Sequence, residues 1–188
     1  MTGTALLLAR HGQTADNAGG LILGRRDPPL SQLGERQAAG LAVRARARGV
    51  VAIWCSPLLR ARQTAAIVGQ AIGVSPVVLE DLIESDRGDW EGASQAVLAQ
   101  RAPEVFAAFE AGDPDFVFPG GESIHTQVLR TRRALAQVAA GLQPSLVVAH
   151  AGTIRAALIA TGQPVGPERA LVNGEAIVLD WTQDDRPS

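Results

Sequence analysis

Three short apolar segments, each followed within two residues by polar side chains, constrain most strongly what this 188-residue chain can fold into. These segments span residues 5–9, 50–54 and 145–149. Their length and apolar character are typical of buried strands. Further strands are expected at residues 77–79 and 176–181. His11, Ser56 and His150 therefore lie at or just beyond the carboxyl ends of the first three strands.

Helices are expected between the strands. Ser31 is placed to cap a helix that continues to about Arg48, because a serine hydroxyl can accept a hydrogen bond from a free amide of the first helical turn. Ser56, followed by Pro57, is interpreted as the cap of the next helix, and Ser123 as the cap of a later one. The remaining helical segments are expected at residues 94–112, with a break near Pro103, and from about residue 153 onward.

Strands that alternate with helices predict an α/β protein, with a three-layer α/β/α fold around a mostly parallel central sheet. In such folds, ligands bind outside the carboxyl ends of the strands. No internal repeat, linker or low-complexity segment interrupts the chain. Residues 1–188 are therefore expected to form a single domain.

Composition excludes several classes of protein. The formal net charge of −2 gives no basic surface for nucleic acid, and no apolar run approaches the roughly 20 residues that span a bilayer. Cys55 is the only cysteine, which rules out an intrachain disulfide and a cysteine-rich metal site. Because the amino terminus lacks the pattern of a signal peptide, a cytoplasmic protein is expected.

The first chemically informative cluster is the turn that contains Arg10, His11 and Gly12, with Asn17 a few residues further on. An arginine offers planar, bidentate donors that suit phosphate, and a glycine lets the backbone approach closely. A histidine can act as a nucleophile and form a covalent intermediate. Taken alone, however, this cluster is more often a loop histidine beside a surface arginine.

Two later segments carry residues of the same kind. Arg60 lies in the first turns of the helix after Ser56, and a helix amino terminus favours anions. His150 closes an apolar strand. Individually, Arg60 fits a solvated helix residue and His150 a core histidine. Their position after strand ends instead favours convergence on the His11 turn.

Together the three segments resemble the histidine phosphatase superfamily, also called the phosphoglycerate mutase-like fold, from about Leu6 to Leu179. The motifs occur in the order expected for that family. Further matches are the loop that begins at Gly24, Leu82-Ile83-Glu84 with Gly88-Asp89-Trp90-Glu91-Gly92, and Pro119-Gly120-Gly121-Glu122-Ser123. Within the family, the chain resembles the phosphatase branch, including broad-specificity and α-ribazole phosphatases.

The resemblance implies a role for each matching residue. His11 corresponds to the nucleophile, which becomes phosphorylated. Arg10, Arg60 and His150 correspond to the residues that hold the phosphoryl oxygens, and Asn17 to a further phosphate ligand. The implied enzyme is a metal-independent phosphomonoester hydrolase without a cofactor, acting on a small phosphorylated metabolite.

The proton donor has two candidates. Glu84 stands two residues after Leu82, where the family pattern has the acid that protonates the leaving alcohol and later deprotonates water. Its neighbour Asp86 is a rival on chemistry alone. The resemblance favours Glu84.

The substrate is expected to contact a helical insertion at about residues 93–122, together with Gly24. All four phenylalanines of the chain fall between Glu84 and His150. Phe109 and Phe116 are the candidates to face the substrate, and they would favour an apolar or aromatic substrate body. Alternatively, these rings only attach the insertion to the sheet.

Two other functions stay open. A phosphoglycerate mutase shares the same core pocket, but the compact chain favours hydrolysis, since family mutases are usually longer. A catalytically silent phosphate-binding scaffold is the other alternative, although such relatives typically lose the nucleophile or a pocket arginine. A homodimer is also left open.

Overall fold

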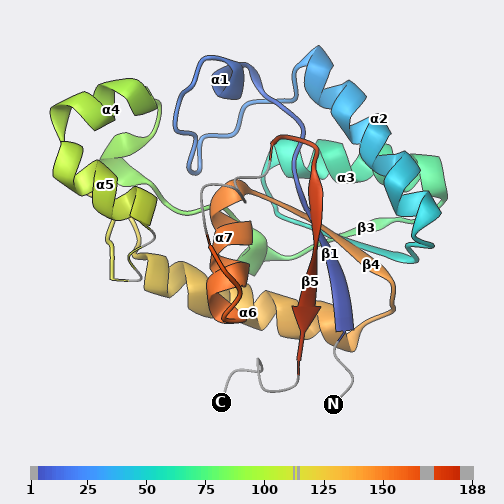
Figure 1. The fold of residues 1–188 in the computed structure, drawn as a ribbon. Coiled ribbons are helices and arrows are strands. Elements are labelled where there is room, and N and C mark those ends of the chain that lie inside the picture. Colours follow the sequence, from blue (N-terminus) through green and yellow to red (C-terminus); the bar gives the residue numbers. More distant parts are fainter. Residues whose placement is uncertain (1–3, 112, 114, 166–171, 183–188) are drawn as a thin grey trace.

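The computed structural model describes residues 4–111, 113, 115–165 and 172–182, which are arranged around a five-stranded sheet (Figure 1). Across the sheet the strand order is β3-β2-β4-β1-β5. The strands are β1 (Thr4–Arg10), β2 (Ala52–Cys55), β3 (Pro76–Val78), β4 (Ser145–Ala149) and β5 (Ala176–Trp181). Every pairing is parallel except that of β1 with β5. The expected mostly parallel sheet is therefore confirmed.

Helices cover both faces of this sheet, as a three-layer α/β/α fold requires (Figure 1). The helices are α1 (Ala15–Ala18), α2 (Gln32–Ala47), α3 (Leu59–Ile72), α4 (Gln95–Arg101), α5 (Pro103–Ala111), α6 (Ile124–Ala140) and α7 (Ala151–Ala160). Two single-turn 3-10 helices, η1 (Glu80–Leu82) and η2 (Gly88–Trp90), follow β3. No helix in the described part of the chain combines the length and the apolar character needed to cross a membrane.

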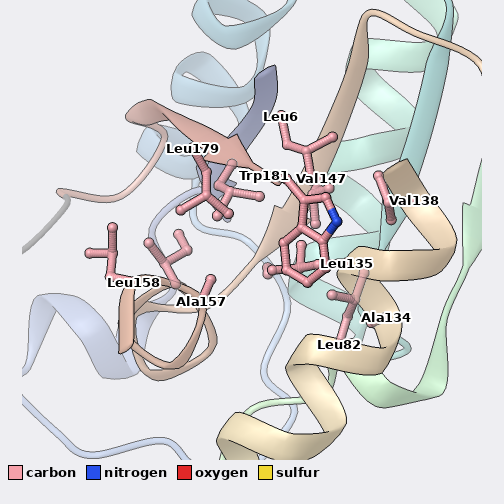
Figure 2. Packing of buried hydrophobic residues seen from close by; sticks show 13 residues of the cluster. Leu6, Leu82, Ala134, Leu135, Val138, Val147, Ala157, Leu158, Leu179 and Trp181 are labelled. Carbon is pink, nitrogen blue, oxygen red and sulfur yellow. The ribbon is translucent and has the colours of Figure 1, made fainter. Parts of the chain in front are cut away.

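Alternation along the central strands divides the core into two layers. In β1, Leu7 and Ala9 face α2 and α3, whereas Leu6 and Leu8 face α6 and α7. Figure 2 shows the second layer, in which Trp181 packs with residues from α6 and α7. Strands buried on both faces read as continuous apolar runs. Each buried leucine side chain contributes about 1.5–3 kcal/mol.

Two of the three predicted helix caps are confirmed. The hydroxyl of Ser31 accepts a hydrogen bond from the Gly34 amide, and that of Ser123 accepts one from the Thr126 amide. The prediction for Ser56 was wrong, because α3 begins only at Leu59.

The buried Ser56 hydroxyl has a different partner. Its oxygen lies 2.7 Å from Nε2 of His150. Pro57 lies in the bend before the helix, and the cap position falls to Leu58, which has no capping side chain. The Ser56 oxygen also accepts a hydrogen bond from the Leu58 amide at 3.3 Å, a contact that precedes the helix instead of capping it. Helix α7 likewise begins earlier than expected, directly after His150.

The expected helical segment at residues 94–112 forms α4 and α5, which are separated at Ala102. Trp90 is the centre of an aromatic cluster, with ring centroids 5.6–6.0 Å from those of the four phenylalanines. The cluster members are Phe106, Phe109, Phe116 and Phe118. The rings therefore pack mainly against one another. That residues 1–188 form one domain stays a prediction.

Candidate active site

The two histidines meet at the centre of the sheet. Strands β1 and β4 are parallel neighbours, with Arg10 opposite Ala149. The His11 amide donates to the carbonyl of Ala149 at 3.0 Å. The ring centroids of His11 and His150 are consequently 5.1 Å apart, although the residues are distant in the sequence.

Local contacts define the protonation state of His11. Its Nδ1 lies 2.7 Å from the carbonyl oxygen of Gly12. Only an N–H can donate to a carbonyl, so the lone pair of the neutral ring is on Nε2. Burial lowers the pKa of His11 to about 3, assisted by the nearby charges of Arg60 and Arg10. The ring is therefore neutral and nucleophilic at physiological pH.

Arg60 is held against His11 by the loop that begins at Gly24. Its Nε donates to Nε2 of His11 at 3.2 Å, and its terminal nitrogens donate to the carbonyl oxygens of Gly24 and Arg26. Asp27 lies 3.7 Å from the guanidinium. Gly24 has a φ of +54°, and an added Cβ would collide with Glu91. The positive φ and the lack of space for a side chain explain why glycine occupies this position.

Asn17 is held at the start of α1. It forms a capping box with Thr14, and its side-chain oxygen also accepts a hydrogen bond from Nδ2 of Asn173 at 3.2 Å. The same Asn173 nitrogen donates to the His11 carbonyl at 3.1 Å. Asn173 therefore links the loop before β5 to the histidine turn. Nothing in the local sequence signalled this residue.

His150 is fully buried behind His11. Its Nε2 pairs with Ser56, whereas its Nδ1 has no hydrogen-bond partner within the described residues. Burial, followed by the charge of Arg60 and the proximity of His11, places its pKa well below the ordinary value. His150 is adjacent to the nucleophile but does not form part of the cavity wall.

Glu84 lies at the opposite side of the site. Its Oε1 accepts hydrogen bonds from the Ser85 amide at 2.8 Å and from Gln127 Nε2 at 3.0 Å, and its Oε2 accepts one from the Gly152 amide at 3.1 Å. Burial opposes ionisation of this carboxyl, but the Arg87 charge and these amides outweigh it and lower the pKa overall. Glu84 is thus a carboxylate in the free site.

Asp86 has a different environment. It pairs with Arg25 at 3.3 Å, and its side chain is 37% exposed. It does not form part of the cavity wall, whereas Glu84 does. The geometry therefore favours Glu84 over Asp86 as the residue that can exchange a proton with a bound substrate.

These residues surround one cavity with a volume of about 540 Å³. Of the residues predicted from the sequence, those in its wall are Arg10, His11, Asn17, Gly24, Arg60, Glu84 and Phe109. Phe116 is absent from the wall, because it is buried in the aromatic cluster around Trp90. A cavity of this size can enclose a phosphoryl group and much of a small alcohol attached to it.

Several wall residues were missed by reasoning from the sequence. Gln127 lies on the buried face of α6, and a polar residue on that apolar face was the available signal. Gly152 lies so close to Glu84 that a Cβ would approach Oε1 to 2.3 Å. Arg87 and Arg155 carried no signal, because arginine is the only cationic residue in this chain besides histidine.

Comparison with known proteins defines the class. The sequence model of the histidine phosphatase superfamily (branch 1) matches residues 6–186. The chain therefore belongs to the histidine phosphatase superfamily, which confirms the resemblance noted from its motifs.

The individual relatives include both phosphatases and mutases. The chain is 38% identical over 157 residues to bifunctional protein Rv2228c of Mycobacterium tuberculosis, covering 82% of this chain but only 43% of that protein. It is 35% identical to the metal-independent phosphoserine phosphatase of Arabidopsis thaliana, covering 81% of this chain and 66% of that one. It is 37% identical to the probable phosphoglycerate mutase GpmB of Klebsiella pneumoniae, covering 87% and 78%. The chain thus spans less than half the length of the first of these relatives.

Solved structures agree with this assignment. A mycobacterial glucosyl-3-phosphoglycerate phosphatase in complex with VO3 superimposes with a TM-score of 0.80 at 30% identity, covering 95% of this chain and 98% of that one. A putative alpha-ribazole-5'-P phosphatase from Escherichia coli superimposes with a TM-score of 0.77 at 27% identity, covering 97% and 92%.

Proposed function

We propose that this chain hydrolyses phosphomonoesters of small metabolites through a phosphohistidine formed at His11. One observation carries the proposal: a neutral histidine whose Nε2 lone pair faces the buried guanidinium of Arg60, with the half-buried Arg10 in the same cavity. Positive donors fixed around a phosphoryl group stabilise the charge that spreads over its oxygens during transfer. Membership of the histidine phosphatase superfamily supports the same reaction.

In the first step, Nε2 of His11 attacks phosphorus in line with the ester oxygen. The new N–P bond forms as the P–O bond to the alcohol breaks, and Glu84 gives a proton to the departing oxygen. Arg60 exchanges its contact with Nε2 for the phosphoryl oxygens, which Arg10 and Asn17 also bind. We include His150 in this phosphate pocket because its ring lies 5.1 Å from that of His11 and its Nδ1 lacks a partner in the described chain, and its contact with a phosphoryl oxygen requires this buried side chain to open to the cavity.

In the second step, the Glu84 carboxylate takes a proton from water, which attacks phosphorus and releases His11 and inorganic phosphate. The carboxylate found in the free site is the form that this step requires. For the first step, the negative charge of the bound phosphoryl group opposes that of Glu84, raises its pKa and favours its protonated form.

Other expectations from the sequence remain part of the proposal. We treat residues 1–188 as one domain in which the insertion at residues 93–122 contacts the substrate, because α5 contributes Phe109 to the cavity wall. A cytoplasmic location and the absence of nucleic-acid partners stay predictions. A homodimer stays open.

Phosphoryl transfer of the mutase type is the second candidate, since the chain is 37% identical to probable phosphoglycerate mutases. The two reactions differ in the fate of the phosphohistidine. Incubation with 3-phosphoglycerate separates them: a hydrolase releases inorganic phosphate, whereas a mutase returns the phosphoryl group to the substrate carbon skeleton.

The central test is the His11→Ala variant, assayed with p-nitrophenyl phosphate. We expect its turnover to fall at least about 10⁴-fold, as for loss of other enzyme nucleophiles, and its phosphoenzyme to disappear from intact-mass spectra recorded without acid. His125→Ala, which alters an exposed histidine of α6, is the matched control and should keep both signals. Substantial turnover by the His11→Ala variant would contradict the assignment.

A further inference from the structure

The cavity wall also contains two guanidiniums to which the proposed reaction assigns no contact with the phosphoryl group. Arg87 comes from the loop before η2, and Arg155 from α7. Both lie beside the aromatic cluster: Cζ of Arg87 is 5.0 Å from the ring centroid of Phe109 and 4.7 Å from that of Phe118, and Cζ of Arg155 is 5.4 Å from that of Phe109.

Arg87 is buried without hydrogen-bond partners for its side chain. Only 9% of the residue is exposed, and its shortest ion-pair contact, with Oε2 of Glu84, measures 3.9 Å. Within the described residues, none of the five N–H groups of this guanidinium donates a hydrogen bond. Burying a charged group in this way is costly unless something else supplies acceptors.

Arg155 is only partly satisfied. One terminal nitrogen donates to the backbone carbonyl of Glu110 at 2.7 Å, but its Nε is buried without a hydrogen-bond partner in the described chain. The carboxylates of Glu84 and Glu110 also line the cavity, yet neither forms a hydrogen bond with Arg87 or Arg155. Both arginines thus line the cavity, and neither guanidinium has all its donors paired within the described residues.

This arrangement changes what the aromatic residues offer to a substrate. Guanidiniums lie over the faces of Phe109 and Phe118, so this part of the wall presents positive charge where the sequence had suggested aromatic surface. Cation–π contacts stabilise a buried guanidinium without using its N–H donors. The rings thus serve as a platform for the two arginines.

We propose that Arg87 and Arg155 bind a second anionic group, a carboxylate or a further phosphate, on the alcohol part of the substrate. This inference rests on the proposed function, because it assumes that the phosphoryl group occupies the His11 end of the same cavity. Arginine suits the role, since its planar fork pairs with two oxygens of one anion.

Two matched pairs of substrates test the inference. O-phosphoserine and O-phosphoethanolamine differ only in a carboxylate, and fructose 1,6-bisphosphate and fructose 6-phosphate differ only in a second phosphate. For each pair, the ratio of kcat/KM is measured by phosphate release. We expect the doubly anionic member to be preferred about 10- to 100-fold in at least one pair, the range that a hydrogen bond to a charged group provides. The pair that shows the preference identifies the anion.

The arginine variants then locate the preference. Arg87→Met and Arg155→Gln should each reduce the ratio towards one, whereas Arg36→Gln, which removes an exposed guanidinium on α2, should leave it unchanged. Because the ratio is formed within each variant, a general loss of catalysis or of folded protein cancels. Arg155→Gln keeps the test valid if Arg87→Met fails to fold.

The outcomes separate this inference from the proposed function. Hydrolysis of both members of each pair at equal rates overturns the second anion subsite and leaves the phosphatase assignment intact. A preference that survives in both arginine variants overturns it as well. Failure to hydrolyse any of these esters or p-nitrophenyl phosphate, without a phosphoenzyme, overturns the proposed function itself.

Discussion

The reactivity proposed for His11 depends on a contact between two adjacent residues. His11 directs its Nδ1 to the carbonyl of the next residue, Gly12, at 2.7 Å. The reactive Nε2 is thereby fixed as the unprotonated nitrogen before any substrate arrives. Position 12 accommodates only glycine, because a Cβ there would lie 2.3 Å from the carbonyl oxygen of Gly34. The glycine beside the nucleophile is thus required by backbone packing against the start of α2.

At the same scale, replacing Glu84 tests its role as the proton donor. Glu84→Gln should lower kcat/KM for glycerol phosphate about 10²- to 10⁴-fold, the usual contribution of a general acid. The loss in kcat/KM should be much smaller for p-nitrophenyl phosphate, because p-nitrophenolate is a stable anion that leaves without a proton. The measurement is kcat/KM for both substrates in both proteins, since this constant reports formation of the phosphohistidine and not the later attack of water, which Glu84 assists for both substrates alike.

Asp86→Asn provides the matched control for this experiment, since Asp86 pairs with Arg25 outside the cavity. It should retain the wild-type ratio of the two kcat/KM values. If Asp86→Asn instead shows the leaving-group dependence and Glu84→Gln does not, the two carboxylates have exchanged roles.

At the scale of elements, α6 holds the segment that carries Glu84. Gln127 donates to the Glu84 carboxylate, and one turn later Arg130 donates to the backbone carbonyls of Asp81 and Ile83. Arg130 also pairs with Glu122 at 2.7 Å, and Glu122 accepts a hydrogen bond from the Asp86 amide at 3.0 Å. Hydrogen bonds thus fix the backbone both before and after Glu84.

These contacts predict unequal effects from two ion pairs on the same helix. Glu122→Ala should destabilise the protein by about 3–5 kcal/mol, because it leaves the Arg130 charge buried without its partner. Asp81→Ala breaks an ion pair with Arg133 in which the Asp81 side chain is 39% and the Arg133 side chain 56% exposed. This change should cost at most about 1 kcal/mol. Urea unfolding measures both free energies, and equal losses would contradict the buried role of Glu122.

The elements also show where reasoning from sequence succeeds. Ser31 and Ser123 were recognisable as caps because each bonds within its own first helical turn. Ser56 was misinterpreted because its oxygen pairs with His150, which follows β4 and is distant in the sequence. Gln127 was missed for the same reason. Sequence rules for helix caps identify hydrogen-bond partners within a few residues. They do not identify a partner that is distant in the sequence.

At the scale of the whole molecule, the site combines residues from both ends of the chain. The convergence of His11 and His150 could be predicted, because the carboxyl ends of parallel strands meet at one edge of a sheet. The positions of Arg87, Arg155 and Asn173 could not, since loops and helix faces place them in the cavity. Family motifs thus identified the His11 end of the cavity but not the part that Arg87 and Arg155 line.

Burial of neutral histidines at the centre of the sheet makes global stability depend on pH. The pKa of His11 is about 3 in the folded protein, against an ordinary value of 6.5 for a histidine. Below pH 6.5 the unfolded chain therefore binds a proton that the folded protein does not. Stability falls as the pH falls from about 6.5 towards 3, and the His11 contribution to this loss reaches about 2 kcal/mol at pH 5. The lowered pKa of His150 acts in the same direction.

Thermal unfolding in phosphate-free buffer at pH 7 and pH 5 measures this effect. His11→Gln should show a smaller decrease in Tm between the two values than the wild type. The His125→Gln variant, which changes an exposed side chain, should show the wild-type decrease. An unchanged decrease in His11→Gln would mean that the folded protein accepts a proton at His11.

The order of the strands has a further consequence for how the chain is made. β1 is the first described strand, yet its two neighbours in the sheet, β4 and β5, are the last two (Figure 1). During synthesis, β1 emerges long before either neighbour and has both edges and both apolar faces uncovered in the meantime. Unpaired edges of this kind promote aggregation of nascent proteins. His11, the proposed nucleophile, therefore directly follows the strand that waits longest for its neighbours in the sheet during synthesis.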